Sequence, residues 1–134
     1  MSYKEEIQGT CKCGHTHSMT LYRSIWGEYP ENRKMVMQDE INVFHCPDCG
    51  FRVKIETSLM YTNADMFFAV IWEPEHDEGI DKNIELLDKL MGKGNYLSEA
   101  PRIKDWEEFK KTIIRFERGE LKGKPPTKMM GLDF

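Results

Sequence analysis

The feature that most constrains this chain is the arrangement of its four cysteines in two close pairs. One residue separates Cys11 from Cys13, two residues separate Cys46 from Cys49, and residues 14–45 lie between the pairs. In a reducing compartment, close pairs of this kind are more typical of metal ligands than of disulfides. Zn²⁺ suits four thiolates because it takes tetrahedral sulfur coordination and has no redox chemistry of its own. The spacing therefore predicts a four-cysteine zinc site formed by Cys11, Cys13, Cys46 and Cys49.

The residues around each pair favour tight turns that bring both sulfurs of the pair to one ion. Pro47 follows the first cysteine of the second pair and fixes its own φ. Gly14 and Gly50 follow the last cysteine of each pair, and glycine readily adopts the positive φ that closes such a turn. We call residues 11–14 and 46–50 the two knuckles. Two knuckles that converge on one ion predict a zinc ribbon.

Three of the four histidines stand close to these knuckles. His15 and His17 follow the first knuckle, and His45 precedes the second, whereas His76 lies far along the chain. Catalytic zinc keeps an open position beside about three protein ligands, whereas structural zinc is closed by four. Because four cysteines already complete a tetrahedron, we interpret the histidines as surface or supporting residues. Only His15 or His17 remains as an alternative to a cysteine ligand.

Strand periodicity surrounds the cysteine pairs. Strict alternation over residues 51–56 predicts that Phe51, Val53 and Ile55 face the core. The run 66–72 is apolar on both faces, which predicts a central strand covered on both sides. Further strands are expected over 17–26 and 41–44, a hairpin connection at 63–65, and a short helix that begins at Pro30 and ends near residue 39.

Helical periodicity dominates the C-terminal half. A first apolar stripe, which ends at Gly92, consists of Ile80, Ile84, Leu87 and Met91. A second, which ends at Gly119, consists of Trp106, Phe109, Ile113 and Phe116. Asp105, with Glu108 three residues later, predicts the start of the second helix. We expect these aromatic stripes to form core, with a loop over residues 92–101.

These patterns predict an α+β fold in which an antiparallel β-sheet carries a zinc-ribbon-like site of four cysteines and two or three helices pack against it. A length of 134 residues fits one domain, which we place at residues 1–122. Its helical part spans about 77–122. Residues 123–134 form a tail, and we expect its apolar end (Met129, Met130, Leu132, Phe134) to dock on the body or on a partner.

A family resemblance rests on four stretches of the chain. They are Ser24-Ile25-Trp26, Ile41-Asn-Val-Phe-His-Cys-Pro-Asp-Cys-Gly, Tyr61-Thr-Asn-Ala-Asp, and Phe67-Phe-Ala-Val-Ile-Trp-Glu-Pro. Over about residues 10–76 the chain resembles the CpXC domain family, small bacterial and archaeal proteins named for their paired cysteine motifs. The family's cysteines map onto Cys13, Cys46 and Cys49. Its first knuckle typically reads Cys-Pro-x-Cys-Gly, whereas here Thr10 takes the first position and Cys11 lies one residue closer. The resemblance implies a zinc-ribbon-like β fold. It does not imply any particular activity.

Charge and hydropathy exclude several classes of function. The net charge is −4, with an acidic segment at 73–100 and a mildly basic one at 101–134. A pI near 5.6 makes a nucleic-acid partner unlikely, because such binders usually carry a strong basic excess. A membrane-spanning helix needs about 18 consecutive apolar residues, and the sequence has no such run. The N-terminal residues lack the apolar stretch of a secretion signal, so we expect a cytoplasmic protein.

Three functional hypotheses follow. The first is a non-catalytic protein whose structural zinc supports a surface for a protein partner. The second is a redox-sensitive zinc-thiolate switch with chaperone-like activity, because the cysteine spacing is similar to that of the oxidation-activated holdase chaperones. The third is a small metal-dependent enzyme, for which the sequence offers no Ser/His/Asp order and no phosphate-binding glycine loop. We favour the first, with iron in a rubredoxin-like centre as the alternative to zinc.

Overall fold

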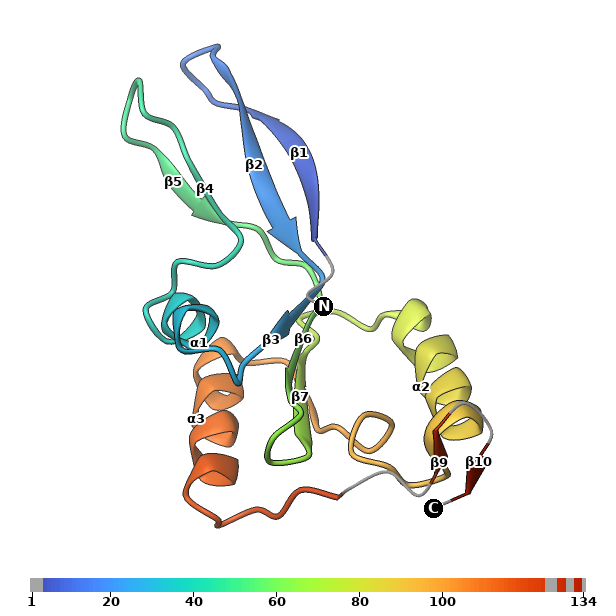
Figure 1. The fold of residues 1–134 in the computed structure, drawn as a ribbon. Coiled ribbons are helices and arrows are strands. Elements are labelled where there is room, and N and C mark those ends of the chain that lie inside the picture. The colour runs from blue at the N-terminus through green and yellow to red at the C-terminus, as the bar shows by residue number, and fades with distance from the viewer. Residues whose placement is uncertain (1–3, 125–127, 130–131, 134) are drawn as a thin grey trace.

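A four-stranded sheet in the order β3-β6-β7-β8 forms the centre of the fold (Figure 1). The computed structural model describes residues 4–124, 128–129 and 132–133. The strands are β3 (Ser24–Trp26), β6 (Leu59–Asn63), β7 (Phe68–Trp72) and β8 (Arg102–Ile103). β6 and β7 pair antiparallel, whereas β3 joins β6 and β8 joins β7 in parallel. The short parallel strand β8 is not among the strands that the sequence predicts.

The strand β7 is buried along its whole length, as its two apolar faces predict. Phe68, Val70 and Trp72 belong to the main core, whereas Ala69 and Ile71 face a smaller core on the other side of the sheet. The strand begins at Phe68 and not at Met66 because residues 64–67 form the turn after β6. Phe67 has a φ of 54° in this turn.

Two helices, α1 (Pro30–Met37) and α3 (Trp106–Glu117), cover the face with the main core (Figure 1). The stripe predicted for α3 is confirmed, because Phe109 and Ile113 are fully buried and Phe116 nearly so. The side chain of Asp105 accepts a hydrogen bond from the backbone N–H of Glu108 at 2.9 Å and caps the helix as expected. Proline begins α1, also as predicted.

The helix α2 (Glu78–Met91) and the loop after it lie against the opposite face of the sheet. The helix ends at Gly92, whose φ of 92° confirms the predicted stop. Its predicted stripe is only half-buried, and Leu86 and Leu90 are exposed. α2 therefore covers the sheet less completely than α3 does.

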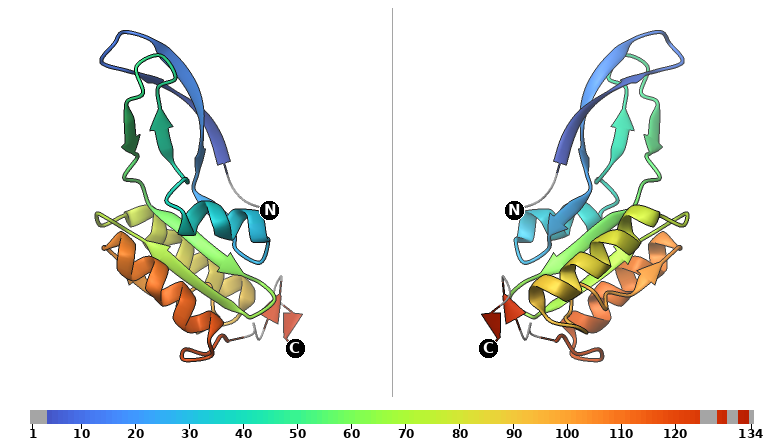
Figure 2. Two further views of the ribbon diagram at one scale, coloured as in Figure 1. Left: turned by 90° about the vertical axis from the view of Figure 1, so that its left-hand side faces the viewer. Right: turned by 90° about the vertical axis from the view of Figure 1, so that its right-hand side faces the viewer.

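Two β-hairpins project from the sheet and its helices as a separate unit (Figure 2). One pairs β1 (Lys4–Thr10) with β2 (Thr16–Tyr22), and the other pairs β4 (Val43–His45) with β5 (Arg52–Lys54). We call these hairpins the arm and the rest of the described chain the body. The small core of the arm consists of Cys11, Phe44 and Cys46, with Met19 and Ile55 packed against them.

The predicted strand 17–26 is divided at Arg23 into β2 and β3, which belong to different sheets. The predicted strand 41–44 starts only at Val43, because Asn42 has a φ of 53°. The buried Asn42 side chain accepts a hydrogen bond from the Tyr22 N–H at 2.7 Å and donates one to the Tyr22 carbonyl at 3.0 Å. Asn42 thereby joins the two hairpins at the base of the arm.

The prediction that Phe51 and Val53 face the core is wrong. These side chains are 37% and 42% exposed, and of the predicted stripe only Ile55 reaches the arm core. The β1–β2 hairpin packs over Phe44 on β4, so β5 remains at the outer edge of the arm (Figure 2). A two-stranded ribbon cannot bury the alternating face that a larger sheet would cover.

The α+β class with antiparallel hairpins and three helices is confirmed. At the predicted tail, the backbone N–H of Lys124 donates to the Phe67 carbonyl at 2.8 Å. A Cβ atom added at Gly123 would lie 2.1 Å from the carbonyl oxygen of Met66, so only glycine fits there. β9 (Lys128–Met129) and β10 (Leu132–Asp133) pair antiparallel close to α2. Met130 and Phe134 of the predicted apolar end lie outside the described residues.

Candidate metal centre

Each cysteine pair lies in the turn at the tip of one arm hairpin. In the first knuckle the Gly14 N–H donates to the Cys11 carbonyl at 2.8 Å, and in the second the Gly50 N–H donates to the Cys46 carbonyl at 2.9 Å. Gly14 and Gly50 have φ values of 91° and 76°. The turns predicted from glycine at these two positions are therefore present.

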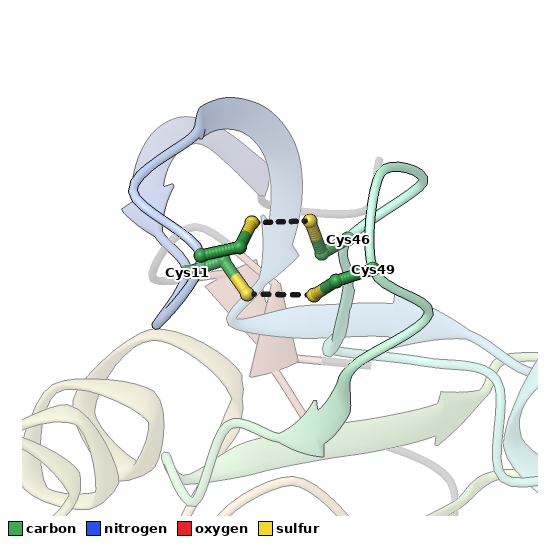
Figure 3. Close-up of side chains that lie close together, drawn as sticks. Cys11, Cys46 and Cys49 are labelled. Carbon is green, nitrogen blue, oxygen red and sulfur yellow. Dashed lines mark hydrogen bonds between the residues drawn. The ribbon is translucent and has the colours of Figure 1, made fainter.

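The two knuckles bring all four cysteine sulfurs together, with every pair of Sγ atoms within 4.8 Å. The Sγ atoms of Cys11 and Cys49 are 3.2 Å apart, and those of Cys13 and Cys46 are 3.6 Å apart. Figure 3 shows Cys11 reaching from one knuckle toward Cys49 on the other. Cys11 and Cys46 are buried, Cys13 and Cys49 are exposed, and none forms a disulfide.

This donor set fits a tetrahedral ion. With Zn–S bonds of about 2.3 Å, the sulfurs of a tetrahedral site lie about 3.8 Å apart. The observed separations, from 3.2 Å to no more than 4.8 Å, bracket this value. All four donors are thiols, so each site position offers the soft ligand that zinc and iron accept. Four cysteines in this arrangement can hold one metal ion.

The thiols of the cluster differ in pKa. A hydrogen bond from the Cys13 backbone N–H, together with the Cys49 thiol, lowers the pKa of Cys11 to about 7. The same contact with Cys11 raises the pKa of Cys49 to about 12, because the neutral Cys49 donates to the Cys11 thiolate. Burial raises the pKa of Cys46, but the backbone N–H groups of Cys49 and Asp48 outweigh it, and the pKa is lowered. A bound cation would displace the remaining protons.

Two histidines and one aspartate lie beside the sulfur cluster. His17 Nε2 is 2.9 Å from Asp48 Oδ2 and 3.6 Å from Cys46 Sγ. His15 Nδ1 is 3.6 Å from the same Asp48 oxygen and 3.3 Å from Cys13 Sγ. Both histidines therefore adjoin the cluster, but Cys11 lies with the other three cysteines in the group of four sulfurs.

The contact of Asp48 with the histidines is one that sequence reasoning missed. In the sequence Asp48 is only a residue between Cys46 and Cys49, whereas in the structure its side chain reaches the opposite hairpin tip. The signal available in the sequence is the pair His15 and His17 directly after the first knuckle. His45, in contrast, is exposed on β4 opposite Arg52.

The comparison with known families agrees with this geometry. A family model described as CpXC protein matches residues 10–119, which is most of the chain. The chain belongs to the CpXC family. The match includes both knuckles of this CpXC protein and continues through α2 and α3, beyond residue 76, where the resemblance in the sequence ends. No curated protein and no solved structure was found to match the chain.

Across residues 4–124 and the two short segments that follow, no helix is long and apolar enough to cross a membrane.

Proposed function

We propose that this CpXC protein is a non-catalytic zinc-binding protein in which one tightly held Zn²⁺ joins Cys11, Cys13, Cys46 and Cys49. The observation that carries the proposal is the meeting of four sulfurs within 4.8 Å at the tips of two separate hairpins. Free thiols in all four positions fit the reducing cytoplasm, which we propose as the location.

The size of the arm core supports a structural role for the ion. Its buried part consists of Cys11, Phe44 and Cys46, so two of its three members are themselves candidate ligands. A structural zinc site contributes roughly 10–16 kcal/mol of apparent binding free energy in zinc-finger peptides. Whole domains are stable by about 5–15 kcal/mol. The ion would therefore supply most of the free energy that stabilises the folded arm, whereas the body has a large apolar core of its own.

The coordination sphere supports a role without catalysis. Four protein ligands close a tetrahedral zinc site and leave no position for a substrate or an activated water. A groove of about 470 Å³ lies between α2 and the sheet, but its lining contains no cysteine and no histidine. We therefore propose that the metal centre acts as a scaffold.

The outer strand of the arm is the surface that we propose for a protein partner. Val53 on β5 and Phe51 directly before the strand are both exposed, just after the second knuckle. The ammonium group of Lys12, from the first knuckle, lies 5.6 Å from the centre of the Phe51 ring. Residues two apart on an extended chain lie on the same side, and adjacent exposed apolar side chains can mark an interaction site. The ion would hold both knuckles, and with them this surface, in place.

Metal analysis of the purified, reduced protein tests the zinc proposal. We expect one zinc per chain to remain after gel filtration. Cys13→Ser and Cys49→Ser should each lose this ion, because three thiolates hold it less tightly than four. His45→Ala, which changes an exposed neighbour of Cys46, is the matched control and should keep it. Retention of the ion by both serine variants would contradict the proposed ligand set.

Affinity capture with immobilised protein tests the partner surface. A partner that binds through β5 should be retained by the wild type and lost by Phe51→Ser, while the zinc content of the variant stays unchanged. Leu86→Ser is the control, because Leu86 is 53% exposed but lies on α2 in the body. Equal retention by all three proteins would rule out this surface.

A redox-sensitive switch with chaperone-like activity is a second candidate, favoured by the exposure of Cys13 and Cys49. Each exposed sulfur lies within 3.6 Å of a buried sulfur on the other knuckle. Hydrogen peroxide would take two electrons from each such pair of zinc-bound thiolates and two protons from solvent, so that one disulfide and two water molecules form and zinc is released. Zinc release coupled to suppression of client aggregation would support this candidate, whereas release without suppression would reject the chaperone activity.

A further inference from the structure

The cluster of His15, His17 and Asp48 is not used by the four-cysteine site. We propose that these three residues, with the Cys46 sulfur as a shared ligand, form a second site for a divalent transition-metal ion such as Zn²⁺. The inference goes beyond the proposed function and rests on it only where the Cys46 thiolate is shared between two ions.

The distances among the ligand atoms of His17, Asp48 and Cys46 fit one ion, and His15 approaches it through its contact with Asp48. Around a tetrahedral ion with bonds of about 2.1 Å to nitrogen and oxygen, ligand atoms lie about 3.4 Å apart. His17 Nε2 and Asp48 Oδ2 are 2.9 Å apart, and His15 Nδ1 lies 3.6 Å from the same oxygen. The Cys46 sulfur is 3.6 Å from His17 Nε2. His17, Cys46 and Asp48 also meet the 4.8 Å limit that the four cysteines meet.

The backbone explains why these side chains converge. His15 precedes β2 and His17 lies within it, and residues two apart along an extended chain point to the same side. Their rings are 6.3 Å apart with 26° between the planes, and a nitrogen of each lies within 3.6 Å of Asp48 Oδ2. Asp48 comes from the other knuckle. The second site, like the four-cysteine site, therefore forms only when the two hairpin tips are together.

Charge favours a cation at this position. Four thiolates around one Zn²⁺ leave a net charge of −2, and the Asp48 carboxylate lies next to them. A thiolate keeps lone pairs after it binds one ion, so Cys46 can bridge to a second. Neutral imidazole and carboxylate are ligands that zinc accepts.

Exposure predicts that the second ion exchanges readily. The side chains of His15, Asp48 and His17 are 61%, 45% and 26% exposed. With three side chains of its own and one shared sulfur, the site borders on solvent. Water can therefore reach the ion and assist its departure. The ion in the second site should leave on gel filtration, whereas the ion among the four cysteines stays.

The competing interpretation is that His17 and Asp48 only orient the ligands of the ion among the four cysteines, as hydrogen-bonding neighbours of metal ligands commonly do. That interpretation allows one ion per chain. The stoichiometry of metal binding separates the two interpretations without any assay of activity.

The experiment starts from reduced protein that carries one zinc after gel filtration. Zn²⁺ is then added in a calorimetric titration, and Co²⁺ in a parallel titration followed by visible absorption. We expect the wild type to bind one further equivalent of each ion. His17→Ala and Asp48→Asn should lose this further equivalent and keep the first zinc, as metal analysis will show. His45→Ala is the matched control and should bind both ions.

Two results would overturn the inference. A wild-type protein that holds one zinc and binds no further Zn²⁺ or Co²⁺ contradicts it and leaves the proposed function intact. Unchanged second binding by both His17→Ala and Asp48→Asn also contradicts it, because the added ion would then lie elsewhere. A wild type that retains no zinc after gel filtration contradicts the proposed function itself. Circular dichroism of each variant confirms that it is folded.

Discussion

Lys54 lies where the arm joins the body, with its ammonium group against two indole rings. The nitrogen is 3.6 Å from the centre of the Trp106 ring and 5.0 Å from that of Trp72, and it donates to the Ile41 carbonyl at 3.2 Å. Burial lowers the pKa of Lys54 to about 8, and the negative charge of Asp39 opposes this shift. A cation in this position links β5 of the arm to β7 and α3 of the body.

We predict that Lys54 makes stability depend on pH in the alkaline range. Between about pH 8 and its ordinary value of 10.5, the unfolded chain binds this proton and the folded chain releases it. The folded state therefore gains stability as the pH rises through this window. In Lys54→Met this gain should be absent, whereas the exposed control Lys34→Met should keep it. Urea unfolding at pH 7.5 and pH 10 measures the difference. An equal pH response of wild type and Lys54→Met would contradict the assignment.

Arg102 carries an ion-pair network between β8 and the start of α2. Its Nε and Nη2 atoms donate to the Glu73 carboxylate at 2.8 and 2.5 Å, and its Nη1 atom donates to Asp81 at 2.6 Å. Glu73 is only 7% exposed, and its pKa is lowered chiefly by these Arg102 contacts. The pair holds the start of α2 against β8.

Arg102→Met should cost about 3 kcal/mol of unfolding free energy, because it leaves the buried Glu73 charge without a partner. Arg52→Met, at an exposed position on β5, should change stability by less than about 0.5 kcal/mol. Urea unfolding at pH 7 compares the two. A loss below about 1 kcal/mol in Arg102→Met would show that solvent already screens Glu73.

At the scale of elements, α2 and α3 have similar apolar patterns but different burial. Four residues of α3 are buried, whereas none of α2 is. Periodicity shows which side of a helix faces the sheet, and it does not show how closely the helix approaches. Phe116 stacks on Phe68 with ring centroids 4.6 Å apart, and Phe109 meets the edge of Tyr61, because α3 lies directly on β6 and β7.

Phe109→Ala should therefore lower the free energy of unfolding by about 3–5 kcal/mol, because it opens a cavity in the main core. Leu86→Ala on α2 should cost less than about 0.5 kcal/mol, since its side chain is already 53% exposed. Thermal and urea unfolding distinguish the two outcomes. Similar losses in both variants would mean that α2 is covered as fully as α3.

The elements that the sequence predicts well are those with local signals. Asp105 and Gly92 mark helix ends through their own hydrogen bond or φ, and Gly14 and Gly50 close the knuckles in the same way. The strands β1 and β8 were missed because their residues are mostly polar or few, and only their partners β2 and β7 make them strands. The exposure of Phe51 also depends on contacts between segments far apart in the sequence, because it is set by how the β1–β2 hairpin packs on the β4–β5 hairpin.

The same limit applies to the metal centre. The pairing of cysteines within each knuckle is predictable because their spacing and turn residues act locally, and the meeting of the two knuckles is predictable because a tetrahedral ion needs both pairs. The approach of His15 and His17 to Asp48 is not, because it depends on how the two hairpin tips meet. At this tip the first hairpin packs closely on the second, since a Cβ atom added at Gly9 would lie 2.6 Å from the Phe44 ring.

At the scale of the whole molecule, arm and body have separate cores of very different size. We predict that chelation of the tight ion will unfold the arm and leave the body folded. Backbone amides of β1, β2, β4 and β5 should lose protection in hydrogen exchange, whereas those of β6, β7 and α3 should keep it. Unchanged protection in the arm would contradict a structural role for the ion, and loss of protection throughout would contradict the independence of the body.

The central claim is that one ion is held by four cysteine sulfurs from two hairpin tips. Zinc-edge X-ray absorption of the protein after gel filtration tests it most directly. We predict a first shell of four sulfur atoms at about 2.3 Å and no nitrogen or oxygen ligand. A first shell that mixes sulfur with nitrogen or oxygen, or a protein that carries no metal, would contradict the claim.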